Sequence, residues 1–182
     1  EIFRIYETGV IRGPIHLAGG NEDELIKTFQ EIKKDDWVCT YYRSHYHALL
    51  KGIPEDWLKE QIVDGRSMEI MSKDYKFVSS AIVGGQLPIA LGIALGIKRD
   101  GSDNQVLAFC GDMAASAGMF HECTQYAGGH DLPITFVVED NGLSIDTPTR
   151  EVWGDSGNDA KVVRYKYGRS YPHHGTGKWI DF

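Results

Sequence analysis

The residues with the clearest chemical potential are an Asp and an Asn that each follow a short apolar run. Asp112 follows Gly111 after residues 105–110, and Asn141 comes 29 residues later, after the run 132–138. Uncharged runs of this length indicate strands that are buried on both faces of a parallel sheet. Carboxylate and amide oxygens suit Mg²⁺, which often shares its coordination shell with phosphates. The pair therefore predicts a socket for Mg²⁺ and a diphosphate.

The segment between the two runs explains how they come together. Residues 114–127 are mostly helix formers and small residues, and Gly128-Gly129 is a stop signal. Strand, helix and strand in this order form a βαβ unit with parallel strands. Asp112 and Asn141 then lie at the carboxyl edge of the sheet, where such folds bind ligands. Each half alone would also fit a plain strand end or turn, so the prediction depends on both together.

Neighbouring backbone groups could complete the socket. The carbonyl of Leu143 is a possible third protein ligand to the metal. The amides of Met113 and Ala114 would open a helix, where unpaired N–H groups favour an anion. Upstream, residues 37–42 are expected to be extended and to deliver Arg43, whose planar fork matches phosphate geometry.

These motifs carry a family resemblance. Residues 111–114 through 141–143 resemble the thiamine-diphosphate motif, and residues 12–17, 42–45 and 81–88 resemble, in order, segments of the alpha subunits of 2-oxo acid dehydrogenase first components. A more distant resemblance is to the N-terminal half of transketolase. The likeness covers residues 10 to about 150. It implies an α/β fold, a parallel sheet with helices on both faces, and thiamine diphosphate and Mg²⁺ as cofactors.

The resemblance also implies roles for individual residues. Asp112, Asn141 and Leu143 would bind the metal, while His45 and His174 would lie near the reacting end of the cofactor, His174 on the stub of an active-site loop. The implied cofactor-binding residues are Tyr42, Arg43, Ala81, Val83, Gly111, Asp112, Met113, Ala114, Asn141, Leu143 and Ser144. A pairing of His45 with His47 on a metal lacks a third ligand, so a packing or hydrogen-bonding role is favoured for them.

Departures from the family pattern leave three functions open. Met113 replaces a glycine, Asp140 replaces the first Asn of a pair, and Glu69 replaces a His. The favoured function is an alpha-type dehydrogenase subunit, inert until a beta subunit supplies the aminopyrimidine-binding half and an activating Glu, and passing the acyl group to a lipoyl acyltransferase. The alternatives are the cofactor-binding half of a split transketolase-like enzyme and a non-catalytic subunit that binds partners.

Composition limits the remaining possibilities. The chain of 182 residues carries a net charge of −7 without a basic cluster, which argues against a nucleic-acid surface. We expect one domain over 1–182, with a helical segment at 1–35 and a shortened part at 152–182. Three cysteines without a CxxC pair indicate reduced core thiols and a cytoplasmic location.

Two further helices are expected. Residues 77–97 lack charge, but their glycines and Pro88 argue against a membrane span, and a helix over 85–98 is expected to be buried and to form a subunit interface. An amphipathic helix should run from Asn21 or Asp23 to about Lys33. Near the other end, residues 161–167 are expected to form a last strand.

Overall fold

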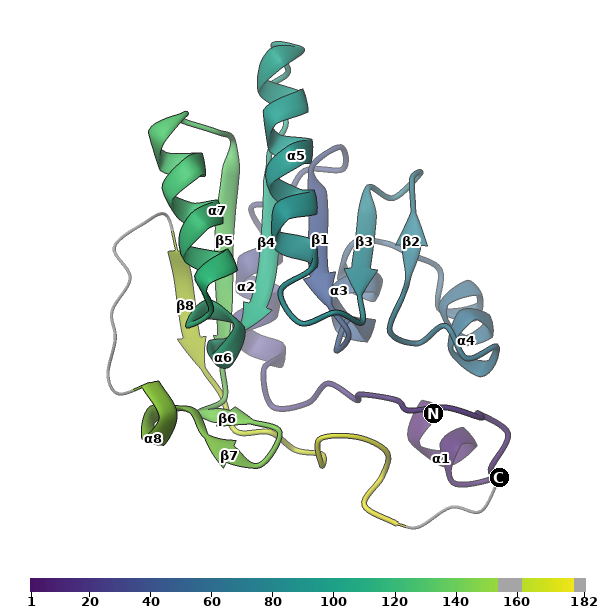
Figure 1. Cartoon of the computed structure of the whole chain (residues 1–182). Coiled ribbons are helices and arrows are strands. Elements are labelled where there is room, and N and C mark those ends of the chain that lie inside the picture. The colour runs from purple at the N-terminus through teal and green to yellow at the C-terminus, as the bar shows by residue number, and fades with distance from the viewer. Residues whose placement is uncertain (154–161, 179–182) are drawn as a thin grey trace.

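A six-stranded sheet forms the centre of the computed structural model, which describes residues 1–153 and 162–178 (Figure 1). Its strands, in spatial order, are β2 (Met71–Ser72), β3 (Phe77–Ser80), β1 (Trp37–Tyr41), β4 (Val106–Gly111), β5 (Ile134–Asp140) and β8 (Val162–Lys166). All neighbours from β3 to β8 pair in parallel, and only β2 is antiparallel to its neighbour. The last strand expected from the sequence is thereby confirmed as β8, although Lys161 lies outside the described residues.

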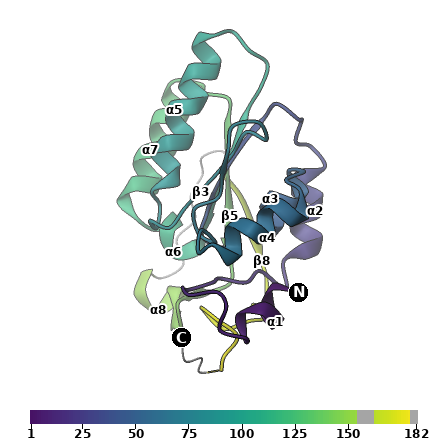
Figure 2. The same cartoon turned by 90° about the vertical axis from the view of Figure 1, so that its right-hand side faces the viewer.

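Helices cover both faces of the sheet, as Figure 2 shows edge-on. One face carries α5 (Gln86–Arg99) and α7 (Gly118–Gly129), and the other carries α2 (Glu22–Phe29), α3 (His45–Leu50) and α4 (Glu55–Val63). The predicted α/β class with helices on both faces is confirmed. The expected division of 1–182 into a single domain with two terminal parts stays a prediction, because residues 154–161 and 179–182 lie outside the description.

The central strands are apolar on both sides, which explains their unbroken hydrophobic sequences. In β4, the side chains of Val106, Ala108 and Cys110 join the core beneath α5 and α7. The alternating Leu107 and Phe109 join the opposite core, which α2, α3 and α4 cover. Successive strand residues point to opposite faces, so a strand between two helical layers is mostly apolar along its whole length.

The structure corrects the predicted helix boundaries. The helix expected over 114–127 is two helices, α6 (Asp112–Ala115) and α7, because Ala117 adopts an extended backbone between them. The helix expected to reach Lys33 ends at Phe29. Beyond it, the backbone N–H of Lys33 donates to the Asp36 carboxylate at 2.9 Å. A local side-chain acceptor of this kind competes with helical hydrogen bonding.

The expected buried helix exists but is buried on one face only. Leu87, Ala90 and Ala94 of α5 are fully buried against the sheet, whereas Ile89 is 48% exposed. Its 14 residues fall short of a bilayer span, and within the described residues no helix is long and apolar enough to cross a membrane. The expected subunit interface on its outer face stays a prediction.

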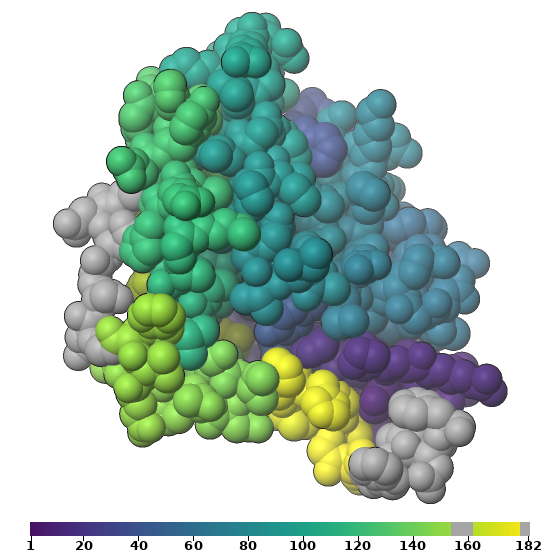
Figure 3. Space-filling model, in the orientation of Figure 1, coloured from purple at the N-terminus to yellow at the C-terminus, as the bar shows by residue number. Residues whose placement is uncertain are grey.

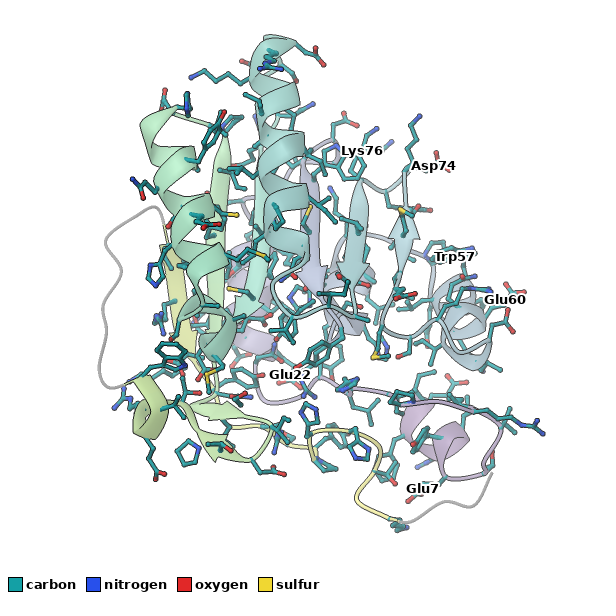
Figure 4. The ribbon with its side chains drawn as sticks, viewed as in Figure 1. Glu7, Glu22, Trp57, Glu60, Asp74 and Lys76 are labelled. Carbon is teal, nitrogen blue, oxygen red and sulfur yellow. The ribbon has the colours of Figure 1, made fainter. Side chains whose placement is uncertain are left out.

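Two segments far apart in sequence run side by side along the carboxyl edge of the sheet. Residues 10–20 (purple) and 167–178 (yellow) lie together beneath the strands in Figures 1 and 3, beside α1 (Ile2–Tyr6). The N–H of Ser170 donates to the Gly19 carbonyl at 3.4 Å, and that of Gly175 donates to the Ile15 carbonyl at 3.0 Å. Glu7, labelled in Figure 4, forms an ion pair of 2.8 Å with Lys178.

Candidate cofactor site

A cavity of about 330 Å³ lies at the carboxyl edge, where the parallel strands end. The residues that follow β1, β3, β4, β5 and β8 all contribute to its wall. Every residue predicted from the sequence to bind cofactor lines it: Tyr42, Arg43, Ala81, Val83, Gly111, Asp112, Met113, Ala114, Asn141, Leu143 and Ser144. Parallel strands with adjacent carboxyl ends produce this convergence from segments spread over about a hundred residues.

Asp112 gives the cavity its clearest chemical demand. The residue is 4% exposed, and its Oδ2 atom has no hydrogen-bond partner among the described residues. Burial raises the pKa of the carboxyl group. A buried carboxylate oxygen without a partner is costly unless a cation, a donor or water satisfies it. The donor set at this position therefore fits a bound cation.

Asn141 and Leu143 lie beside Asp112 in a tight turn. The Asn141 Oδ1 accepts a hydrogen bond of 2.9 Å from the Leu143 N–H, and its amide nitrogen donates to the Tyr167 hydroxyl at 3.4 Å. Gly142 between them has a φ of +73°, a conformation that glycine adopts without strain. The amide oxygen keeps a second lone pair for a ligand.

The donors at the site are mixed in type. In the part of the chain that the structure describes, no three His, Cys, Asp or Glu side chains are grouped to hold a metal. A metal at Asp112 would thus need amide, carbonyl or ligand oxygens, which is the shell that Mg²⁺ takes beside phosphates. The predicted metal ligands are brought together, and metal binding by them stays a prediction.

The structure weakens one argument for anion binding near Met113. The helix α6 that starts here has only four residues, so its macrodipole is small. The Met113 side chain occupies the place expected for a glycine, and its sulfur accepts a hydrogen bond of 2.7 Å from the indole of Trp153, in α8 (Thr149–Trp153). This contact links α8 to the cavity wall.

Arg43 is buried within the wall. One guanidinium nitrogen donates to the Leu17 carbonyl and the other to the His173 carbonyl, the latter at 3.3 Å. The guanidinium thus connects the two segments that run along the carboxyl edge. Its planar fork has five N–H donors, so donors remain for an anion in the cavity.

The two predicted catalytic histidines do not line this cavity. His45 lines a separate pocket, and its Nε2 lies 2.9 Å from the Ser67 hydroxyl. Burial lowers the pKa of His45 to about 4. The imidazole that reaches the main cavity from the C-terminal segment is His173 rather than its neighbour His174. Catalytic roles for His45 and His174 stay predictions, without geometric support in this arrangement.

The sequence did not identify several polar residues that line the cavity: His16, Tyr41, Gln86, Glu139, Tyr167, Arg169 and His173. His16 lies within residues 12–17, one of the segments that carry the family resemblance. Arg169 and His173 follow the last strand. Because that strand is parallel to β5, its end predicts that these residues lie at the carboxyl edge of the sheet.

Glu139, the residue before the last of β5, belongs to a buried polar network. Its carboxylate lies 3.0 Å from His47 Nε2 and accepts hydrogen bonds from Tyr165 and, at 2.9 Å, from Asn21. Burial acts to raise the pKa of Glu139, but His47 and the hydrogen bonds outweigh it and lower that pKa. The role favoured from the sequence for His47, packing or hydrogen bonding rather than metal binding, agrees with this contact and with its edge-on contact to Phe109, 4.5 Å between ring centroids.

Comparisons with known proteins show the family of the chain. The family model described as "Dehydrogenase E1 component" matches residues 2–158. The chain is 30% identical over 158 residues to the alpha subunit of acetoin:2,6-dichlorophenolindophenol oxidoreductase of Bacillus subtilis, covering 81% of this chain and 47% of that protein. It is 33% identical over 152 residues to the mitochondrial pyruvate dehydrogenase E1 component subunit alpha of Dictyostelium discoideum, covering 79% and 40%.

A third relative shows the same pattern of coverage. The chloroplastic pyruvate dehydrogenase E1 component subunit alpha-3 of Arabidopsis thaliana is 30% identical over 172 residues, covering 82% of this chain and 40% of that protein. The chain thus spans less than half the length of the curated relatives it matches. The match to most of its residues nevertheless shows that the chain belongs to the dehydrogenase E1 component family.

Proposed function

We propose that this chain binds Mg²⁺ and thiamine diphosphate and serves as the alpha-type subunit of a 2-oxo acid dehydrogenase. The observation that carries the proposal is the buried, partnerless Oδ2 of Asp112, in a cavity that Asn141, Leu143 and Arg43 also line. Family membership and the names of the relatives, which are alpha subunits of pyruvate and acetoin enzymes, support the same assignment.

Each wall of the cavity has a part in this function. Asp112, Asn141 and the Leu143 carbonyl would hold the metal, while Tyr42, Arg43 and the backbone at Met113 and Ala114 would hold the diphosphate. Ala81, Val83 and Ser144 would enclose the cofactor. When bound, thiamine diphosphate supplies the nucleophile and the electron sink that decarboxylation of a 2-oxo acid requires. The chain itself contributes binding, orientation and exclusion of water.

The proposal includes partners. A beta-type subunit would supply the aminopyrimidine-binding half and the activating Glu, and a lipoyl acyltransferase would receive the acyl group. Exposed apolar side chains on and just before α5, among them Ile82, Val83 and Ile89, support contact with another subunit. The three described cysteines are buried and free, which supports a reducing compartment such as the cytoplasm.

Calorimetry with thiamine diphosphate tests the proposal directly. We expect thiamine diphosphate to bind only when Mg²⁺ is present. Asp112→Ala should abolish this binding, because Asp112 is the one charged residue among the three predicted metal ligands. Asp103→Ala is the matched control, since it removes an exposed carboxylate at the opposite edge of the sheet. Unchanged affinity in Asp112→Ala would remove the metal assignment.

A non-catalytic, partner-binding subunit is the second candidate. It is favoured by Met113 on the cavity wall and by the positions of His45 and His174 outside the cavity. This candidate predicts no binding of thiamine diphosphate with Mg²⁺ by the wild-type chain. The split transketolase-like enzyme is distinguished by transfer of two-carbon units from ketose phosphates instead of acyl transfer to a lipoyl group.

A further inference from the structure

A second cavity, of about 220 Å³, lies between α1, α3 and α4. In Figures 1 and 2, α1 lies below α4. Residues 17–18 and Tyr171 complete the wall, and no residue lines both this cavity and the main one. None of the residues proposed to hold the metal or the diphosphate reaches it, so the proposed function leaves this cavity unexplained.

The inner wall of the second cavity is apolar. Leu58 and Ile62 of α4 are 3% and 1% exposed. The half-buried rings of Phe3 and Tyr171 contact each other in the same wall, with 5.8 Å between their centroids. Ligand pockets typically combine such an apolar lining with a few polar groups. Since an apolar cavity of roughly 150 Å³ accommodates benzene, this one has room for a substituted benzene ring.

His45 supplies a buried polar group to this wall. Its Nε2 lies 2.9 Å from the Ser67 hydroxyl, and burial lowers its pKa to about 4. The imidazole is therefore neutral near pH 7. The Ser67 contact uses one ring nitrogen, and the other can donate to or accept from a ligand, according to its tautomer. The wall thus offers hydrogen bonding without charge at its buried part.

The charged side chains of the wall are its exposed part. Lys59 and Glu1 form an ion pair, in which their side chains are 40% and 54% exposed, and Glu55 is also exposed. Lys59 is the one Lys or Arg among the described residues of this wall, and Glu1 already neutralises it. A charged ligand would lose its hydration without gaining a buried counter-charge, which is costly. The cavity therefore favours an uncharged ligand.

Hydrogen bonds hold parts of this wall in place. Arg43 donates to the carbonyl of Leu17, which lines the second cavity. It also donates, at 3.3 Å, to the carbonyl of His173, two residues after Tyr171. Leu17 and Tyr171 are thereby fixed from the side of the main cavity. A cavity whose wall is already ordered costs a ligand less free energy on binding.

We propose that the second cavity binds an uncharged molecule that has one aromatic ring and one hydrogen-bonding group, of the size of phenol. The ring packs against Leu58, Ile62 and Phe3, and the polar group forms a hydrogen bond with His45. This site is separate from the proposed function, because it needs neither Mg²⁺ nor thiamine diphosphate.

Proton NMR of the full chain tests the site, with phenol as the probe and without Mg²⁺ or thiamine diphosphate. We expect saturable shifts of the His45 ring resonances, while those of the exposed His130 stay unchanged. Benzoate, which has the same ring but carries a charge, should bind at least about tenfold more weakly than phenol. His45→Leu should weaken phenol binding at least about tenfold, because the buried hydroxyl loses its partner. Toluene, which has no hydroxyl, should bind this variant and the wild type within about threefold.

A matched pair of variants locates the ligand independently of His45. Leu49 lines the cavity from an exposed position of α3, whereas its neighbour Leu50 is similarly exposed but does not line it. Leu49→Trp should fill the cavity and weaken phenol binding at least about tenfold, because the indole takes the volume of the ring. Leu50→Trp should leave the affinity within about twofold.

Three outcomes would overturn the inference: no phenol-dependent shift of His45, benzoate binding as tight as that of phenol, and equal phenol affinity in Leu49→Trp and Leu50→Trp. If His45→Leu does not fold, the pair at positions 49 and 50 still decides the location. Calorimetry with Mg²⁺ and thiamine diphosphate reports separately on the proposed function, because no residue of that site lines the second cavity.

Discussion

His45 should make the folded chain sensitive to mild acid. The residue is 6% exposed, its imidazole lies 2.9 Å from the Ser67 hydroxyl, and burial lowers its pKa from 6.5 to about 4. The folded state therefore resists a proton that the unfolded chain accepts readily. Because the folded pKa is the lower one, stability is complete above pH about 6.5 and is lost as the pH falls from there towards about 4.

The size of the effect follows from the two pKa values. Linkage gives a loss from His45 of roughly 1.4 kcal/mol at pH about 5.5 and roughly 2.5 kcal/mol at pH about 4.5. Since domains of this size are stable by only about 5–15 kcal/mol, such a loss should be easy to measure. His45→Gln replaces the imidazole with an amide that does not titrate. At pH about 4.5 the variant should have lost roughly 2.5 kcal/mol less stability on acidification than the wild type.

Urea denaturation at pH about 8 and about 4.5 measures the difference. The substitution also costs a pH-independent amount through altered packing, so the quantity that matters is the change between the two pH values. His130→Gln is the control, because His130 is exposed. Equal acid sensitivity in the wild type and His45→Gln would refute the argument that burial of His45 is responsible.

Three further predictions concern the framework around the site. Gly20→Ala should lower stability by more than about 2 kcal/mol in urea denaturation, because φ is +89° and the new Cβ would meet the Gly168 carbonyl oxygen at 2.0 Å. Gly101→Ala, with positive φ but open space, should cost less and isolates the backbone part. Phe109→Ala should cost about 3–5 kcal/mol, measured in the same way, because the ring is fully buried. Burial raises the pKa of Cys39 to about 12, so iodoacetamide should label this thiol at pH about 8 only after unfolding.

Much of the site could be predicted because it depends on short-range sequence. Strand ends are visible where an apolar run stops, and Asp112 and Asn141 stand at two such stops. In a parallel sheet all those stops share one edge, so residues at strand ends are neighbours whatever their separation in the chain. Arg43 could be placed by the same logic, since it follows β1.

The directions in which the histidine side chains point could not be predicted from the sequence. His45 and His173 both lie in segments that follow strands ending at the cavity. His45 nevertheless lines a separate pocket, whereas His173 lines the cavity. In α3 the helical twist turns His45 away towards Ser67, and a rotation of about 100° per residue cannot be inferred from a motif match. Whether His173 or His174 points into the cavity likewise depends on the path that the segment 167–178 takes as it runs beside residues 10–20.

The sequence by itself determined the α/β class, the carboxyl-edge site and the group of residues around Asp112, because hydrophobic pattern and motif spacing are local properties. Only the tertiary structure decided that Arg169 and His173 complete the cavity wall and that Glu139 and His47 form one buried network. The Glu139–His47 contact and the Arg43–His173 contact each join segments more than ninety residues apart. Such pairings depend on how helices and strands pack against one another, and neither the order of residues nor their periodicity specifies that packing.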